Sequence, residues 1–190
     1  MSPTRPEAAL RLTPIDRPRS LLVRLFDWLI RRRLGKSMMP SRVIYARFPA
    51  LLWCTLPLYY LLDRRLQLER ELIHLIELRV SVLNGCSFCS DIHRASAMIE
   101  QTSIAKLDAA VSGEDFAAFS ARERVALRYV TEIAVGGATD ATFAALQSAF
   151  SEREIVQLTW LQAFTTYLNR MAVPLGIGSD GFCALRVKSG

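Results

Sequence analysis

An apolar helical stripe that stops at an Asn-Gly pair constrains this chain more than any other feature. Leucine, isoleucine and valine recur every three or four residues from Leu68 to Leu83, the spacing that places them on one face of an α-helix. Asn84 and Gly85 then break the pattern, because these residue types favour the backbone conformations that end helices. A further helix is expected from Cys86 to about Ile99. The segment therefore predicts two consecutive helices joined by a tight turn.

The other segments also predict helices, and none shows the sustained alternation of a strand. Two capping boxes, at Ser120–Glu123 and Ser151–Glu154, open helices that we expect to end near Val135 and before Pro174. Shorter helical patterns cover residues 20–34, 47–62, 104–111 and 140–150, and Pro57 should kink or divide the second of them. The sequence therefore predicts an all-α fold.

We expect three parts along the chain. Residues 1–36 form a basic arm that is partly disordered, because four prolines fall within residues 1–19. Residues 37–178 form one helical domain, which begins with a linker up to Ser41. Residues 179–190 form a loose C-terminal tail.

Positive charge is concentrated in the N-terminal quarter of the chain. Residues 1–47 hold 11 Lys and Arg against 3 Asp and Glu, whereas the remaining residues hold 13 against 15. The basic character thus belongs to the arm and not to the domain. We expect this arm to be solvated or to contact another subunit. We expect no nucleic-acid partner, and contact with an anionic membrane surface is the less favoured alternative.

Four cysteines, two of them in one C-x-x-C, predict redox or metal chemistry in a reducing compartment and not a disulfide framework. No secretory signal is visible, because charged residues interrupt the apolar run after the first arginines. The most apolar run, Ala50–Leu62, contains Pro57 and is too short to span a bilayer. We therefore expect a cytoplasmic protein.

Cys86, Cys89 and His93 have the spacing that places three side chains along one helix face. A helix N-terminus favours a thiolate, and a thiolate can attack a peroxide to give a sulfenic acid that a second thiol closes to a disulfide. His93 can hold the proton taken from Cys89. The alternatives are buried packing cysteines or a zinc site. We expect Cys54 and Cys183 to be structural.

A second polar stripe precedes the cysteines. His74, Glu77 and Ser81 follow one another at helical spacing and point toward the Asn-Gly break. His74 or Glu77 could be a fourth zinc ligand or could take part in the thiol chemistry. Alternatively, the two residues could simply lie on a solvated helix face.

Residues 78–93, LRVSVLNGCSFCSDIH, resemble the signature of the AhpD-like alkylhydroperoxidases in the carboxymuconolactone decarboxylase superfamily. Supporting likeness lies at residues 45–52, 119–127, 150–158 and 167–170, so the resemblance covers about residues 42–178. It implies an all-helical trimer or hexamer and a thiol-dependent peroxidase that needs no prosthetic group. It also implies that Cys89 attacks the peroxide, that Cys86 resolves the product, and that His93 is the imidazole of the motif.

One position departs from the family pattern. The family usually has a glutamate twelve residues before the first cysteine, where this chain has His74. We hypothesise that Glu77, with His74, takes over that part of the relay. The favoured function is reduction of hydrogen or organic peroxides through a Cys86–Cys89 disulfide cycle, with electrons from an external dithiol. The alternative is a zinc-stabilised or non-enzymatic redox-sensing or interaction domain.

Overall fold

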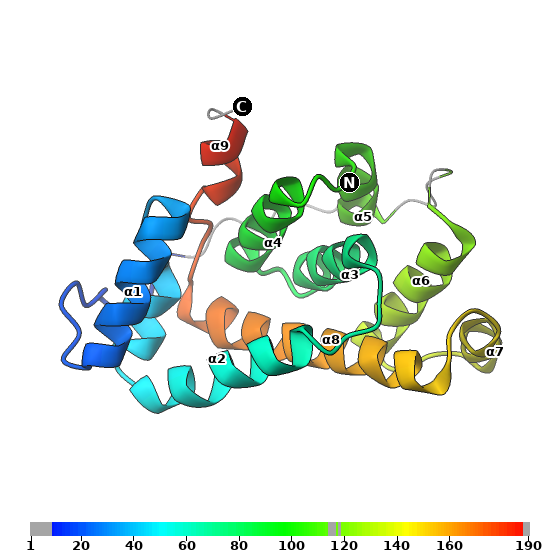
Figure 1. Cartoon of the computed structure of the whole chain (residues 1–190), viewed down its shortest axis with the longest axis horizontal. Coiled ribbons are helices and arrows are strands. Elements are labelled where there is room, and N and C mark those ends of the chain that lie inside the picture. Colours follow the sequence, from blue (N-terminus) through cyan, green and yellow to red (C-terminus); the bar gives the residue numbers. More distant parts are fainter. Residues whose placement is uncertain (1–8, 114–116, 118, 188–190) are drawn as a thin grey trace.

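The computed structural model describes residues 9–113, 117 and 119–187. These residues contain no strand, so the all-α prediction is confirmed. The elements (Figure 1) are α1 (Leu21–Leu34), a π-helical turn η1 (Ser41–Tyr45), α2 (Pro49–Asp63), α3 (Arg70–Leu83), α4 (Ser87–Ile99), α5 (Ile104–Ser112), α6 (Ala121–Val135), α7 (Asp140–Ala149), α8 (Glu152–Ala172), a 3-10 turn η2 (Val173–Leu175) and α9 (Phe182–Val187).

Helix α3 lies at the centre of the molecule, packed against α4, α5, α6 and α8 (Figure 1). Its predicted apolar face, including Leu72, Ile76 and Val80, packs into a core shared with α6, α7 and α8. Leu75 and Leu78 face a second core with α5. A helix that is buried on every side also buries its polar residues. The polar stripe therefore lies inside the protein and not on a solvated face.

Local capping explains where the later helices begin and end. Both predicted capping boxes form, at Ser120–Glu123 on α6 and at Ser151–Glu154 on α8. Each supplies two of the amide partners that a helix start otherwise lacks. Gly136 caps the end of α6. Pro57 lies inside α2 without ending that helix. The helix expected over residues 104–111 is α5, which ends at Ser112, and Gly113 follows as its left-handed cap.

The N-terminal arm is not a separate, poorly ordered extension where the structure describes it. Residues 1–8 lie outside the described part, but residues 9–20 are tied to the domain. The Arg11 amide donates to the carbonyl of Leu175, and the Ile15 amide donates to the carbonyl of Arg42, both at 3.0 Å. Helix α1 packs on α2 and η1 and buries Val23 completely. The linker predicted before residue 41 leads directly into η1.

The prediction of a loose tail is wrong for residues 182–187, which form α9 against α4. The carboxylate of Asp91 accepts hydrogen bonds from the amides of Phe182 and Cys183, at 2.8 and 2.9 Å. These are the first two amides of α9, which have no partner within the helix. Phe182 is buried in the cluster that contains Cys86 and Cys89. The tail thus covers one side of the cysteine turn.

Candidate active site

The turn between α3 and α4 positions the two cysteines. Gly85 adopts a positive φ of 67°, which a residue with a Cβ rarely adopts. The Asn84 side chain donates to Thr166 at 3.1 Å and to Asn169 at 2.9 Å, which anchors the turn to α8. Cys86 is the N-cap of α4 and accepts a hydrogen bond from the Cys89 amide. Cys86 therefore lies at the helix N-terminus, as predicted, but just before the first helical residue.

Cys86 and Cys89 are joined by a disulfide, with their Cα atoms 5.3 Å apart. Both residues are buried, at 1% and 3% exposure. The spacing predicted to bring the two sulfurs together therefore does so. The bond closes across the first turn of α4, so both sulfurs belong to one short segment of the chain.

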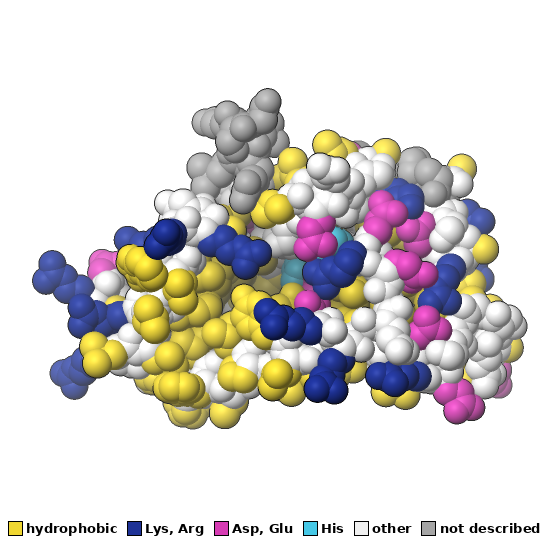
Figure 2. Space-filling model, in the orientation of Figure 1, with side chains coloured by type: hydrophobic (Ala, Val, Ile, Leu, Met, Phe, Trp, Pro, Cys, Tyr) yellow, Lys and Arg dark blue, Asp and Glu magenta, His cyan; other side chains and the backbone are white. Residues whose placement is uncertain are grey.

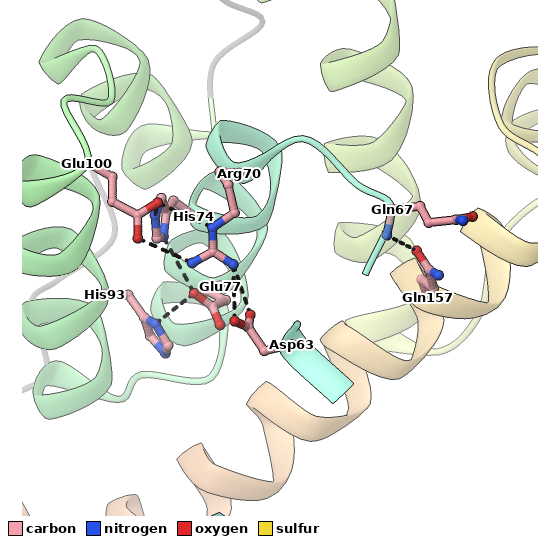
Figure 3. Close-up of polar contacts among 8 residues, drawn as sticks. All are labelled: Asp63, Gln67, Arg70, His74, Glu77, His93, Glu100 and Gln157. Carbon is pink, nitrogen blue, oxygen red and sulfur yellow. Dashed lines mark hydrogen bonds and ion pairs between the residues drawn. The ribbon is translucent and has the colours of Figure 1, made fainter. Parts of the chain in front are cut away.

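A buried carboxylate links the two histidines of the chain (Figure 3). Glu77 Oε2 lies 3.1 Å from Nδ1 of His93 and 3.8 Å from Nδ1 of His74. Glu77 is 3% exposed and His74 is 2% exposed, which excludes a solvated helix face. With Nδ1 directed at Glu77, Nε2 is the nitrogen of His93 that remains for a thiol or a substrate. His93, which can act as a base, and Glu77, which orients it, thus lie on the adjacent helices α4 and α3.

Three charged residues that the sequence reasoning missed continue this cluster toward the surface (Figure 3). Nε2 of His74 lies 3.1 Å from Glu100, whose side chain is 42% exposed. Arg70 lies 3.2 Å from Glu100 and 3.0 Å from Asp63, at the end of α2. Arg70 stands four residues before His74, so the helical period could have placed it on this stripe. Glu100 caps the end of α4, seven residues after His93, so the helical period could have placed it on the same face. Asp63 comes from the end of α2 and carries no comparable sequence signal.

The charges in this cluster shift one another's pKa values. Burial would raise the pKa of Glu77, but the charge of His93 and the contact with His74 outweigh it, and the pKa is lowered. Burial would lower the pKa of His74, but Glu77 and Glu100 outweigh it, and that pKa is raised. The charge of Glu77 also raises the pKa of Tyr59, so this phenol stays protonated. Glu77 is therefore an anion, held by the two imidazoles.

A cavity of about 400 Å³ opens onto this cluster. Its lining includes Cys89, His93, Glu77 and His74 but not Cys86. In Figure 2 hydrophobic side chains cover most of the hollow, and histidine and acidic groups are visible at one end. The rest of the lining is mainly apolar and comes from α1, α2, η1, α4 and α8. Of the two sulfurs, the one predicted to attack is thus the one that faces the cavity.

The structure gives little support to a zinc site or to a packing role for Cys54. Within the described residues, no group of three His, Cys, Asp or Glu side chains converges as metal ligands. Cys54 is exposed, which contradicts a structural role in packing. Cys183 is half-buried, with its sulfur 3.6 Å from that of Met98. No described helix is both long and apolar enough to cross a membrane.

Comparison with known proteins identifies the family. The carboxymuconolactone decarboxylase family matches residues 49–132. A protein of unknown function from Agrobacterium tumefaciens, provisionally named as the antioxidant defence protein AhpD, is 31% identical in sequence. Its superposition covers 73% of this chain and 97% of that chain, with a TM-score of 0.66. The chain belongs to the carboxymuconolactone decarboxylase family.

Two further relatives extend beyond the matched segment. The uncharacterised protein YnjA of Escherichia coli K12 is 28% identical over 171 residues, which cover 88% of this chain and 93% of YnjA. The debrominase Bmp8 is 18% identical and superimposes over 91% of this chain and 94% of its own, with a TM-score of 0.77, which shows a shared fold. All five predicted site residues lie within the carboxymuconolactone decarboxylase match, whereas α1 lies outside it.

Proposed function

We propose that this protein is a thiol-dependent peroxidase that reduces hydrogen or organic peroxides through a Cys86–Cys89 disulfide cycle. The observation that carries the proposal is that Cys89, His93 and Glu77 line one cavity while Cys86 lies within disulfide distance of Cys89. A nucleophile, a base and a resolving thiol are the groups that this chemistry requires. The AhpD designation of the relative from Agrobacterium tumefaciens also supports it.

In the first step the Cys89 thiolate attacks one peroxide oxygen, an S–O bond forms and the O–O bond breaks. His93, which holds the thiol proton on Nε2, returns that proton to the leaving alkoxide or hydroxide, so an alcohol or water departs. Glu77 holds Nδ1 of His93 at 3.1 Å and stabilises the imidazolium.

In the second step the Cys86 thiol attacks the Cys89 sulfenic acid, the S–S bond forms and water leaves. The peroxide has then gained the two electrons that the two thiols lost. An external dithiol reopens the disulfide by exchange and becomes oxidised itself. We propose no prosthetic group for this cycle.

Stopped-flow oxidation of the reduced protein by cumene hydroperoxide tests the proposal. A Cys54→Ser background removes the exposed thiol, and Cys89→Ser and Cys86→Ser are compared in it. We expect Cys89→Ser to abolish the fast oxidation. We expect Cys86→Ser to oxidise once, to a sulfenic acid that dimedone traps on Cys89. Equal, slow oxidation of all three proteins would contradict a peroxidase.

Turnover separates the remaining alternatives. With excess dithiothreitol a peroxidase consumes many equivalents of hydroperoxide, whereas a redox sensor is oxidised without sustained consumption. Stoichiometric zinc that resists mild chelation would support the zinc-stabilised domain instead. Release of bromide from 2,3,4-tribromopyrrole, which a Bmp8 structure contains, without peroxide consumption, would instead favour dehalogenation, as expected of a debrominase.

A further inference from the structure

The cavity has two chemically different ends. At one end the charged groups of α2, α3 and α4 surround Cys89, and this end includes the acids Asp63, Glu77 and Glu100. Helix α1 contributes Phe26, Ile30, Arg33 and Leu34, and in Figure 1 it lies beside the start of α2, away from the end of α2 that carries Asp63. These four residues recur at helical spacing, so one face of α1 forms a wall of the cavity. Arg33 is the charged residue on that wall.

The size of the cavity is far greater than hydrogen peroxide needs. Its volume is about 400 Å³, whereas a water molecule, with half the oxygen atoms of hydrogen peroxide, takes roughly 30 Å³ of liquid. Cavities of this volume with mainly apolar walls hold molecules with many carbon atoms. If the substrate were only small and polar, the apolar walls would contribute nothing to its binding.

The arginines of the two ends differ in their partners. Arg70 is neutralised by Asp63 and Glu100. Arg33 has no ion pair or hydrogen bond of its own within residues 9–113, 117 and 119–187, and it is exposed. The nearest acid in sequence, Asp27, is taken by Arg31 and by the hydroxyl of Ser37. The α1 end thus carries an uncompensated positive charge, whereas at the Cys89 end the acids are paired with Arg70 and the two imidazoles.

We propose that this cavity binds an elongated aliphatic monocarboxylate, with its carboxylate at Arg33 and its chain directed toward Cys89. An anionic group is attracted to the free guanidinium, whereas the charged groups at the opposite end are already paired with one another, and this difference sets one orientation. The apolar walls accept the chain. Under the proposed function, on which this part rests, the substrate is a hydroperoxide of such an acid.

The N-terminal arm then determines specificity. Helix α1 lies before the segment that matches the family, which begins at residue 49. The groups proposed for the thiol chemistry lie inside that segment, and the wall that selects the substrate lies outside it. The basic arm would therefore act on the cavity of its own chain, and not only as a solvated extension or subunit contact.

Equilibrium binding of cis-parinaric acid, a fluorescent polyene fatty acid, and of its methyl ester tests this proposal. The oxidised protein is used, because its closed disulfide prevents thiol chemistry at Cys86 and Cys89. Arg33→Gln is compared with Arg32→Gln, a neighbouring arginine that stacks on Trp28 at 5.6 Å and does not line the cavity. Ile30→Trp fills the cavity, and circular dichroism confirms its fold.

We expect the wild type to bind the acid more tightly than the ester. Arg33→Gln should weaken binding of the acid roughly threefold, the effect of one exposed ion pair, and leave the ester unchanged. Arg32→Gln should leave the affinities for the acid and the ester unchanged, and a folded Ile30→Trp should weaken both affinities. Raising the salt concentration should reduce the preference for the acid.

Equal affinity of the wild type for acid and ester would overturn the proposal. So would equal effects of Arg33→Gln and Arg32→Gln, or unchanged binding by a folded Ile30→Trp. None of these binding measurements depends on peroxide turnover, so they test the carboxylate site even if the peroxidase proposal fails. Conversely, if the protein consumes cumene hydroperoxide but fails these binding tests, the peroxidase proposal stands and only the proposed specificity is wrong.

Discussion

Glu77 lies 3.1 Å from Nδ1 of His93, and its carboxylate is almost completely buried. The two residues come from adjacent helices, α3 and α4, which pack on each other across the Asn-Gly turn. An ionised carboxylate in this position keeps the proton of a neutral imidazole on Nδ1 and leaves Nε2 as an acceptor. This contact gives His93 the tautomer that a general base requires.

Replacing Glu77 by glutamine should slow oxidation of Cys89 by about 100-fold, because a neutral amide no longer stabilises the imidazolium. The same change should raise the pKa of the Cys89 thiol. Stopped-flow rates with cumene hydroperoxide across a pH series measure both effects. Glu152→Gln is the matched control, because Glu152 is exposed in the first turn of α8, far along the chain from the cluster. If Glu77→Gln behaved like Glu152→Gln, the relay hypothesis would be wrong.

His74 should make the protein less stable at high pH. Its pKa is raised in the folded protein, so its charged form stabilises the fold fully below the unfolded value of about 6.5. That contribution is lost as the pH rises through the folded pKa. The lowered pKa of Glu77 acts only in acid, where its contribution is lost as the pH falls below 4.5. Above the unfolded pKa of His74, about 6.5, the change from this pair therefore belongs to His74.

Urea unfolding of the oxidised protein at several pH values measures this effect. The wild type should lose more unfolding free energy on going to high pH than His74→Gln does. Glu100→Gln should fall between them, because Glu100 supplies part of the charge that raises the pKa of His74. Parallel pH profiles for the three proteins would show that His74 carries no stabilising charge.

The sequence predicts those parts of the site that lie close together along the chain. Helical spacing aligns His74 with Glu77, and the Asn-Gly break places Cys86 at the start of a new helix. The order and approximate bounds of α1 to α8 follow from the same periodicity and from the capping boxes. Each of these inferences uses only residues within a few turns of one another, where local geometry decides the outcome.

Features that depend on contacts between distant segments are not predictable in this way. Asp63 reaches the site from the end of α2, Glu100 meets His74 of α3 from the end of α4, and Asp91 caps α9 from 91 residues away. Helix α1 shows an apolar face in the sequence, but nothing there says that this face lines the cavity of Cys89. The burial of the His74–Glu77 stripe also follows only from the central position of α3.

Asn84→Ala should destabilise the folded protein by about 1–3 kcal/mol, the cost of leaving a buried polar partner unsatisfied. Its amide bonds Asn169, which is fully buried and donates in turn to Ser81. Urea unfolding measures the loss, with Ser87→Ala as the control because Ser87 is exposed at the start of α4. Equal stability of the two variants would mean that this contact does not hold the cysteine turn to α8.

Trp53, Leu58 and Leu61 form an exposed apolar face on α2, at 61%, 45% and 62% exposure. Their spacing places them on one side of the helix, together with the exposed thiol of Cys54. Contiguous apolar surface of this kind marks contact sites, and we predict that it mediates the expected trimer or hexamer. Multi-angle light scattering should give an oligomer for the wild type and a smaller mass for Trp53→Glu.

Cys54 reports on the same contact. In an oligomer built on this face the thiol should react slowly with a maleimide, and in Trp53→Glu it should react quickly. Val156→Glu is the control, because Val156 is 68% exposed on α8 and should leave both mass and labelling unchanged. A monomeric wild type would show that there is no subunit contact. An oligomer whose Cys54 reacts as fast as in Trp53→Glu would show that the contact lies on another surface.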